Sequence, residues 1–78
     1  MKNIKDLFMA RSKLTDKEWV DLIREFYKFL QKDLRIGQSY FNALAIVKPD
    51  LANEIQGTED DCFYDDNKVI KFIRRLNE

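Results

Sequence analysis

Carboxylates are the residues of this chain whose number and spacing best suit chemistry. Five of them gather between residues 57 and 67, namely Glu59, Asp60, Asp61, Asp65 and Asp66. Oxygen ligands of this kind suit hard cations such as Ca²⁺ and Mg²⁺. An EF-hand loop, however, needs oxygen ligands at alternate positions, a glycine at the sixth and a glutamate at the twelfth, whereas Phe63 and Tyr64 occupy the middle of this stretch. We therefore expect no metal site there.

A structural role is the simpler interpretation of the same stretch. Thr58 and Asp61 are residue types that fix turns through side-chain hydrogen bonds to the backbone. Phe63 would anchor the loop to the core. Asp65, Asp66 or Asn67 would cap the helix that follows, at the end where the helix dipole favours a negative charge.

Other catalytic and metal chemistry lacks the residues it needs. The chain has no histidine and a single cysteine, Cys62, which excludes Ser/His and Cys/His nucleophile pairs and a structural zinc site. Gly37 and Gly57 are isolated and begin no phosphate-binding loop. We expect no catalytic residue, no metal and no cofactor, and hence a protein that is not an enzyme.

The cysteine count and the length of the apolar runs indicate the cellular compartment. One cysteine cannot form an internal disulfide, which favours a reducing compartment. No apolar run approaches the roughly 20 residues of a membrane span, and Lys2, Lys5 and Asp6 interrupt the start of the chain where a signal peptide needs apolar residues. A cytoplasmic protein is expected, in the host cytoplasm if the protein is viral, with no membrane partner.

Apolar residues recur with helical periodicity along almost the whole chain, and no stretch shows the alternation of a strand. A chain of 78 residues forms one domain with one core, so we expect a single helical domain over residues 1–78. The predicted fold class is all-α, a compact bundle of about five helices, two long and three short. The first is expected at residues 4–10, where Ile4, Leu7 and Phe8 lie on one side.

The second helix has the clearest start. Thr15 and Glu18 form a capping-box pattern, which predicts a helix from about Asp16. Its inward side is expected to carry Trp19, Leu22, Ile23, Phe26, Phe29 and Leu30. Val20 and Tyr27 lie at the edge of this stripe and would be exposed first, so they are the expected interface if the protein is a homodimer rather than a monomer.

The second half of the chain is divided by glycine and proline. Residues 35–39, around Gly37, are expected to form a loop into a third helix that runs to about Val47. Pro49 ends that helix by residue 48 and suits the first turn of a short fourth helix, which ends where Gly57 can adopt a left-handed conformation.

Two apolar sets complete the expected core. The fourth helix would turn inward the side chains of Leu51, Ala52 and Ile55. Residues 58–66 follow as a loop, and a last helix would carry Val69, Phe72, Ile73 and Leu76.

Residues 35–76 carry a pattern that resembles a known family. The pattern is Arg35-x-Gly37-Gln38-x-x-Phe41-Asn42-x-Leu44, then Pro49-x-Leu51, then Gly57-Thr58-x-x-Asp61-x-Phe63-Tyr64-Asp65-Asp66 and a closing amphipathic helix. It is similar to a family of small proteins from phages and bacterial mobile elements that has no assigned activity. The resemblance implies a viral or prophage setting and no chemistry. Members of that family often have a proline at the position of Cys62, which argues against a functional thiol.

Charge is balanced overall but unevenly placed. Residues 1–35 hold nine basic and six acidic side chains, residues 36–67 hold one and seven, and residues 68–78 hold four and one. Either the basic ends fold over the acidic middle and neutralise it, or the protein presents a dipolar surface to a partner.

The function we expect is that of a non-catalytic protein-interaction module. Its acidic, aromatic loop would dock a basic patch of an unidentified protein, and the amides of Gln38 and Asn42, placed opposite Phe41 on the third helix, are further recognition groups unless they satisfy loop carbonyls. The candidate surface comprises Arg35, Gln38, Asn42, Asp60, Asp61, Tyr64, Asp65 and Asp66.

A nucleic-acid accessory factor is the alternative function. It would use the basic side of the last helix, formed by Lys68, Lys71, Arg74 and Arg75, unless these residues form only a solvated face. Lys28, Lys32 and Arg35 could extend this surface. Binding of this kind would weaken steeply with salt, because contacts to phosphates release counterions.

Overall fold

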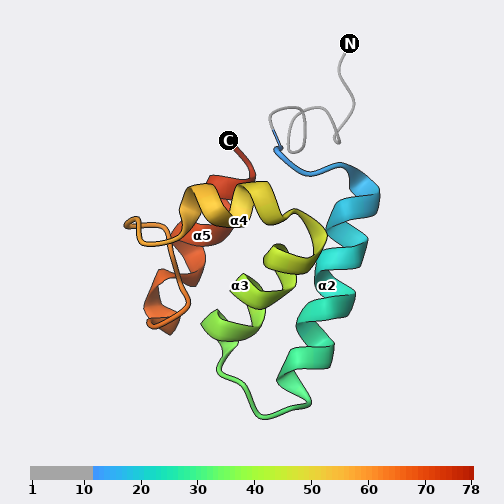
Figure 1. Ribbon diagram of the computed structural model, residues 1–78, viewed down its shortest axis with the longest axis vertical. Coiled ribbons are helices and arrows are strands. Elements are labelled where there is room, and N and C mark those ends of the chain that lie inside the picture. Colours follow the sequence, from blue (N-terminus) through green and yellow to red (C-terminus); the bar gives the residue numbers. More distant parts are fainter. Residues whose placement is uncertain (1–11) are drawn as a thin grey trace.

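A computed structural model describes residues 12–78, which form four α-helices and one short 3₁₀ turn (Figure 1). The helices are α2 (Asp16–Leu30), α3 (Ile36–Val47), α4 (Pro49–Ile55) and α5 (Val69–Leu76), and the turn η1 (Asp66–Lys68) leads into α5. The part of the chain described contains no strand, so the all-α prediction is confirmed. It has four α-helices rather than about five, and the helix expected at residues 4–10 lies outside the described residues. No described helix is long and apolar enough to cross a membrane.

The start of α2 forms the predicted capping box. The Glu18 amide donates to Thr15 Oγ1 at 3.1 Å, and the Thr15 amide donates to Glu18 Oε1 at 2.8 Å. This hydrogen bond from the Thr15 backbone lowers the pKa of the Glu18 carboxyl, and Lys48, with its Nζ 3.4 Å from Glu18 Oε1, lowers it further. The local sequence therefore fixes the beginning of α2, and Glu18 also makes a long-range contact to Lys48 at the end of α3.

One side of α2 is less covered than the sequence suggests. Leu22 and Phe26 are buried as expected, and Val20 and Tyr27 are exposed at 58% and 60%. Ile23, expected on the inward side, is 40% exposed. Among the described elements α2 packs along α3 alone, and a single neighbour covers a narrower stripe than half of a helix. This exposed edge is where the homodimer left open by the sequence would form.

The central element is α3, which contacts α2, α4, η1 and α5. It begins at Ile36, so Gly37 to Ser39 lie in its first turn and not in the loop expected there. Phe41 and Leu44 are buried, and the rings of Phe26 and Tyr40 stack at a centroid distance of 3.9 Å. A helix with neighbours on several sides is covered around more of its circumference than a helix with one neighbour.

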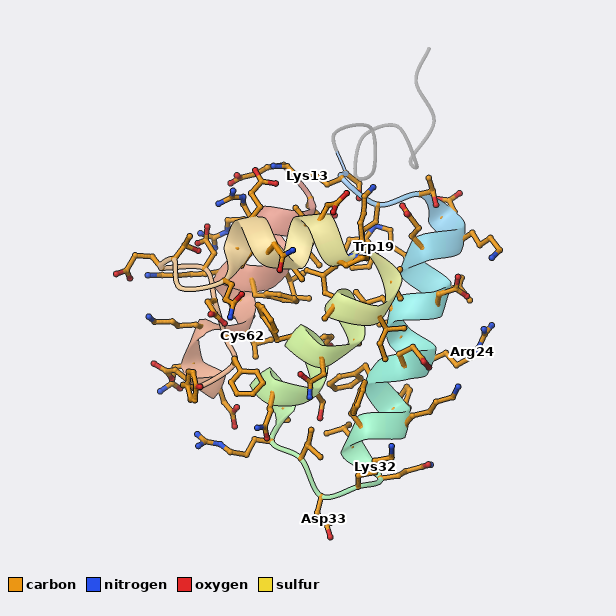
Figure 2. All side chains as sticks on the ribbon, viewed as in Figure 1. Lys13, Trp19, Arg24, Lys32, Asp33 and Cys62 are labelled. Atoms are coloured by element: carbon orange, nitrogen blue, oxygen red, sulfur yellow. The ribbon has the colours of Figure 1, made fainter. Side chains whose placement is uncertain are left out.

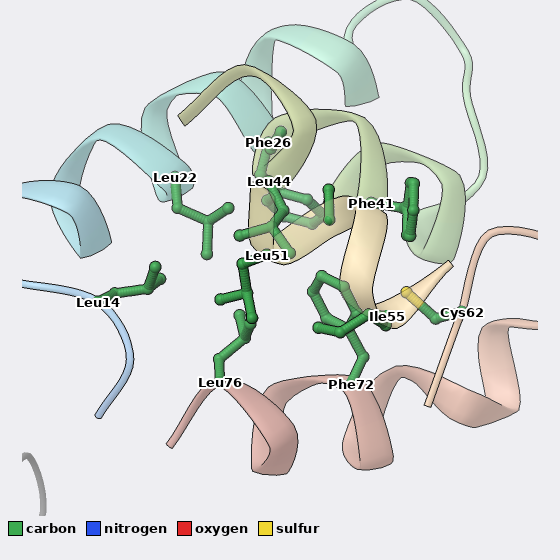
Figure 3. Packing of buried hydrophobic residues seen from close by; sticks show 12 residues of the cluster. Leu14, Leu22, Phe26, Phe41, Leu44, Leu51, Ile55, Cys62, Phe72 and Leu76 are labelled. Atoms are coloured by element: carbon green, nitrogen blue, oxygen red, sulfur yellow. The ribbon is translucent and has the colours of Figure 1, made fainter. Parts of the chain in front are cut away.

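The core lies between α3 and the helices around it (Figure 3). Its buried apolar side chains are Leu14, Leu22, Phe26, Phe41, Ala43, Leu44, Leu51, Ala52, Ile55, Cys62, Phe72 and Leu76. The inward sets predicted for α4 and α5 are confirmed, with Val69 and Ile73 partly buried against the cluster.

The residues before α2 are tied to the end of α5. The Lys13 amide donates to the Leu76 carbonyl at 2.8 Å, and Lys48 Nζ donates to the Lys13 carbonyl at 2.7 Å. Trp19 Nε1 donates to Ser12 Oγ at 2.8 Å, which gives the indole a polar partner while its ring packs on the core (Figure 2). These bonds join the first described residues to α5, to the end of α3 and to α2.

We expect Ser39→Ala to stabilise the fold by about 1 kcal/mol, because a buried hydroxyl without a hydrogen-bond partner costs desolvation free energy. Ser39 lies fully buried in α3, and its Oγ has no partner within residues 12–78. Alanine is also the better helix former. Urea unfolding of the two proteins measures the difference. A destabilised alanine variant would show that the hydroxyl has an acceptor in solution.

Candidate functional site

The loop after α4 is held by the side chain of Asp61. Gly57, with φ +78°, ends α4 in the left-handed conformation that the sequence predicts. The Gly57 amide donates to Asp61 Oδ2 at 2.8 Å, and the Phe63 amide donates to Asp61 Oδ1 at 2.9 Å. Thr58 Oγ1 donates to the Ile55 carbonyl at 2.6 Å. The predicted turn-fixing roles of Thr58 and Asp61 are therefore confirmed, and both arms of the loop depend on one carboxylate.

Two further acids of the loop act as helix caps. The Asn67 amide donates to Asp65 Oδ1 at 2.9 Å, so Asp65 caps η1, whereas α5 itself has Lys68 at its N-cap and no side-chain cap. Asp66 instead serves α3, because the Gly37 amide donates to its Oδ1 at 2.9 Å. Arg35 supplies no cap of its own to α3, and its Nε lies 3.8 Å from Asp66 Oδ2. A cap provided from 29 residues away explains why α3 begins before Gly37 and not after it.

Cys62 and Gly37 meet at the same place. The Cys62 Sγ donates to the Gly37 carbonyl at 3.2 Å, and the Cys62 carbonyl lies where a Cβ on Gly37 would stand. The thiol is fully buried in the core (Figure 3). This burial raises the pKa of Cys62 to about 12, and the nearby Asp61 carboxylate raises it too. The thiol therefore stays protonated at neutral pH and packs as part of the core.

The buried thiol gives the fold an alkaline limit that can be measured. The reference pKa of 9.0 applies to the unfolded chain, so above about pH 9 the unfolded state loses the thiol proton while the folded state keeps it up to about pH 12. Stability should therefore fall with rising pH across this window, by up to about 1.4 kcal/mol per pH unit from this group. Urea unfolding at several alkaline pH values, compared with Cys62→Ala, isolates the effect. Equal slopes for the two proteins would contradict it.

The acidic loop and the basic last helix pair with each other. Arg75 Nη1 lies 3.0 Å from Asp60 Oδ2, and Arg75 Nη2 lies 3.4 Å from Glu54 Oε1. Lys68 Nζ lies 3.9 Å from Glu59 Oε2. The basic end of the chain thus neutralises part of the acidic middle, as one of the two interpretations of the charge pattern requires.

These ion pairs reduce the surface on which the nucleic-acid alternative depends. Two of its four basic side chains, Lys68 and Arg75, are engaged with carboxylates. Lys71 and Arg74 are exposed and make no ion pair among the described residues. Two free cations give a small electrostatic footprint for nucleic acid.

A cavity of about 320 Å³ opens between α3, the end of α4 and the loop. The residues that line it are three aromatic ones, two with side-chain amides, one glycine and one acid, namely Phe41, Phe63, Tyr64, Asn42, Gln56, Gly57 and Asp61. The volume is at the lower end of the roughly 300–1,000 Å³ typical of ligand sites, and a lining that combines aromatic rings with a few polar groups is also typical.

The three aromatic rings of the cavity wall extend from the buried core to the solvent. Phe41 is buried and meets Phe63 edge to face at a centroid distance of 5.9 Å. Phe63 in turn meets Tyr64 edge to face at 4.7 Å. The Tyr64 side chain is 84% exposed. Apart from this contact with Phe63 most of the Tyr64 ring is open to solvent, which makes it the most accessible part of the site.

No protein-family model matches this chain, and it has no significant match among curated proteins or solved structures. The function must therefore be argued from the site.

Three of the predicted surface residues meet at the cavity, namely Asn42, Asp61 and Tyr64. The others lie elsewhere: Arg35 and Asp66 at the start of α3, Asp65 at η1, and Asp60 on Arg75, while Gln38 lies outside the cavity wall. The sequence pattern placed Asn42 opposite Phe41, whereas both line this cavity. Gln56 was missed, and its position directly before the helix-ending Gly57 is the signal that could have found it.

A larger hollow of about 560 Å³ runs along α2 towards Ile46 and Val47. Its polar wall consists mainly of ion pairs within α2, such as Arg24 to Asp21 at 3.2 Å and Lys28 to Glu25 at 3.0 Å. Ion pairs of this kind stabilise a helix surface and leave few charged groups available to a ligand. Within residues 12–78 no three acidic or cysteine side chains form a metal-binding group.

Proposed function

We propose that this protein is a non-catalytic protein-interaction module that binds its partner at the cavity beside Tyr64. The observation that carries the proposal is an aromatic ring 84% exposed at the rim of a concave, aromatic-lined site. Tyrosine is enriched in protein interfaces, and anchor residues cluster where a pocket can be fully desolvated. The Asn42 and Gln56 amides on the wall have no hydrogen-bond partner among the described residues, so a partner can satisfy them.

The loop that forms the outer wall is pre-organised for binding. Asp61 accepts amide hydrogen bonds from Gly57 and Phe63, and the Asp60 amide donates to Thr58 Oγ1 at 3.2 Å. Because the loop is already ordered by these bonds, a partner would lose less affinity to the cost of ordering it. A rigid rim also favours binding of one specific partner over nonspecific association.

The partner we propose is a host or phage protein. The support for this setting is the resemblance of residues 35–76 to small proteins of phages and mobile elements. The acidic segment from residue 36 to residue 67 favours a partner with a basic surface.

Affinity capture from a bacterial lysate tests the proposal when three baits are compared: the wild type, Tyr64→Ser and Ile70→Ser. Ile70 is the matched control, because it is a large apolar side chain 67% exposed on α5 and away from the cavity wall. We expect a protein that the wild type and Ile70→Ser retain and Tyr64→Ser loses. Capture that ignores Tyr64, or that depends on Ile70 instead, would reject the cavity as the interface, and no capture by any bait would reject the function.

A further inference from the structure

We infer that the cavity binds an arginine side chain of the partner protein. The inference rests on the proposed function and names the chemical group that the site would recognise. Three properties of the cavity lead to it: an uncompensated negative charge, aromatic faces at the rim, and amide oxygens without donors.

The charge comes from Asp61, the one carboxylate on the wall. No lysine or arginine lines the cavity, and no basic side chain of residues 12–78 forms an ion pair with Asp61. Each carboxylate oxygen accepts one backbone hydrogen bond and keeps a second lone pair for a further donor. The site therefore favours a cationic occupant and disfavours an anionic one, which would meet this charge.

The rim suits a flat cation. Tyr64 and Phe63 meet edge to face with their planes at 73°, so a group entering the cavity meets aromatic surface at the rim. A guanidinium stacks on aromatic faces, and cation–π contacts favour arginine over lysine.

The side-chain amides of Asn42 and Gln56 provide hydrogen-bond acceptors for the guanidinium. Asn42 and Gln56 each offer a side-chain carbonyl oxygen, and neither has a donor among the described residues. A guanidinium has five N–H donors in one plane, whereas an ammonium has three donors at one point. A guanidinium therefore has enough donors to serve Asp61 and an amide oxygen at the same time. A purely apolar side chain would leave these acceptors desolvated and unpaired, which costs binding free energy.

Titration with short blocked peptides tests the inference on the whole chain. The probes are acetyl-Gly-Arg-Gly-amide and the same peptide with citrulline, lysine or leucine in the central position, observed by ¹⁵N–¹H NMR. We expect the arginine peptide to shift the side-chain amide signals of Asn42 and Gln56 and the backbone signal of Tyr64, with a dissociation constant on the order of 1 mM. Citrulline, which keeps the shape and loses the charge, should bind about tenfold more weakly.

Variants locate the binding without disturbing the loop. Tyr64→Leu and Gln56→Leu remove recognition groups that make no hydrogen bond within the described chain, and each should weaken arginine binding several-fold. Ile70→Ser is again the matched control and should bind as the wild type does. Chemical shifts elsewhere in the spectrum report that each variant is folded.

The outcomes separate the inference from the proposed function. Equal binding of the arginine and citrulline peptides, or arginine shifts confined to the acidic side of α2, would overturn the inference. Preference for the leucine peptide at the cavity would overturn it while supporting an interaction site there. If none of the four peptides shifts the cavity signals, the arginine inference fails, and the proposed function then stands or falls on the dependence of capture on Tyr64.

Discussion

Gly37→Ala is expected to lower the free energy of unfolding by about 3 kcal/mol, at the upper end of the cost of overpacking a core. The added Cβ would overlap the Cys62 backbone carbonyl and would approach Asp66 Oδ1 to 3.0 Å. A backbone carbonyl cannot turn aside as a side chain can. Relief would require the loop to move away from α3, which would also break the bond from the Gly37 amide to Asp66. The free energy of unfolding of a domain of this size is only a few kcal/mol, so part of the Gly37→Ala population should be unfolded.

Gly57→Ala provides the matched control for this prediction. Gly57 has φ +78°, and nothing lies within 4 Å of the place where its Cβ would stand. The cost is then that of left-handed backbone alone, about 1 kcal/mol. At Gly37 alanine has no such penalty and would gain up to about 1 kcal/mol as a helix former. Urea unfolding shows which of the two variants is less stable. A Gly37→Ala protein at least as stable as Gly57→Ala would contradict the close contact between Gly37 and the Cys62 carbonyl.

Features that depend on neighbouring residues could be predicted from the sequence. The capping box joins Thr15 and Glu18, three residues apart, and Pro49 occupies the first turn of α4 as its fixed backbone requires. Gly57 takes the left-handed conformation at the end of α4. In each case the atoms that determine the structure lie within one turn of chain, so their residue types are sufficient.

Contacts between distant segments could not be predicted in the same way. The cap that Asp66 gives to Gly37 joins residues 29 positions apart, and it moves the start of α3 ahead of the glycine that suggested a loop. Ile23 is 40% exposed and α3 is the one described element that packs on α2, and the periodicity of α2 carries no information on how many neighbours cover it. The same limit applies to the site. The loop could be recognised as acidic and aromatic, but its partner wall on α3 and α4 depends on how the helices cross.

Asp61→Ala is expected to lower the free energy of unfolding by about 2–3 kcal/mol, because two backbone amides lose a charged hydrogen-bond acceptor. A hydrogen bond to a charged group contributes about 1.5–3 kcal/mol, and the partly exposed position of Asp61 reduces this contribution. The amides are those of Gly57 and Phe63. Asp65→Ala is the matched control, since Asp65 accepts one amide hydrogen bond, from the exposed Asn67, and should cost about 1 kcal/mol. Urea unfolding gives both values.

Hydrogen exchange shows where the Asp61→Ala effect acts. The amides of Gly57 and Phe63 should exchange faster by more than the loss of global stability explains, whereas amides of α2, which packs along α3, should follow the global loss alone. Unchanged exchange at Gly57 and Phe63 would contradict the role of the carboxylate in the loop. Tyr64→Leu completes the comparison, because its ring contributes to the cavity rim and makes no hydrogen bond in the loop. Arginine binding should therefore fall in both variants, and stability should fall only when Asp61 is replaced, because this one carboxylate both orders the loop and charges the site.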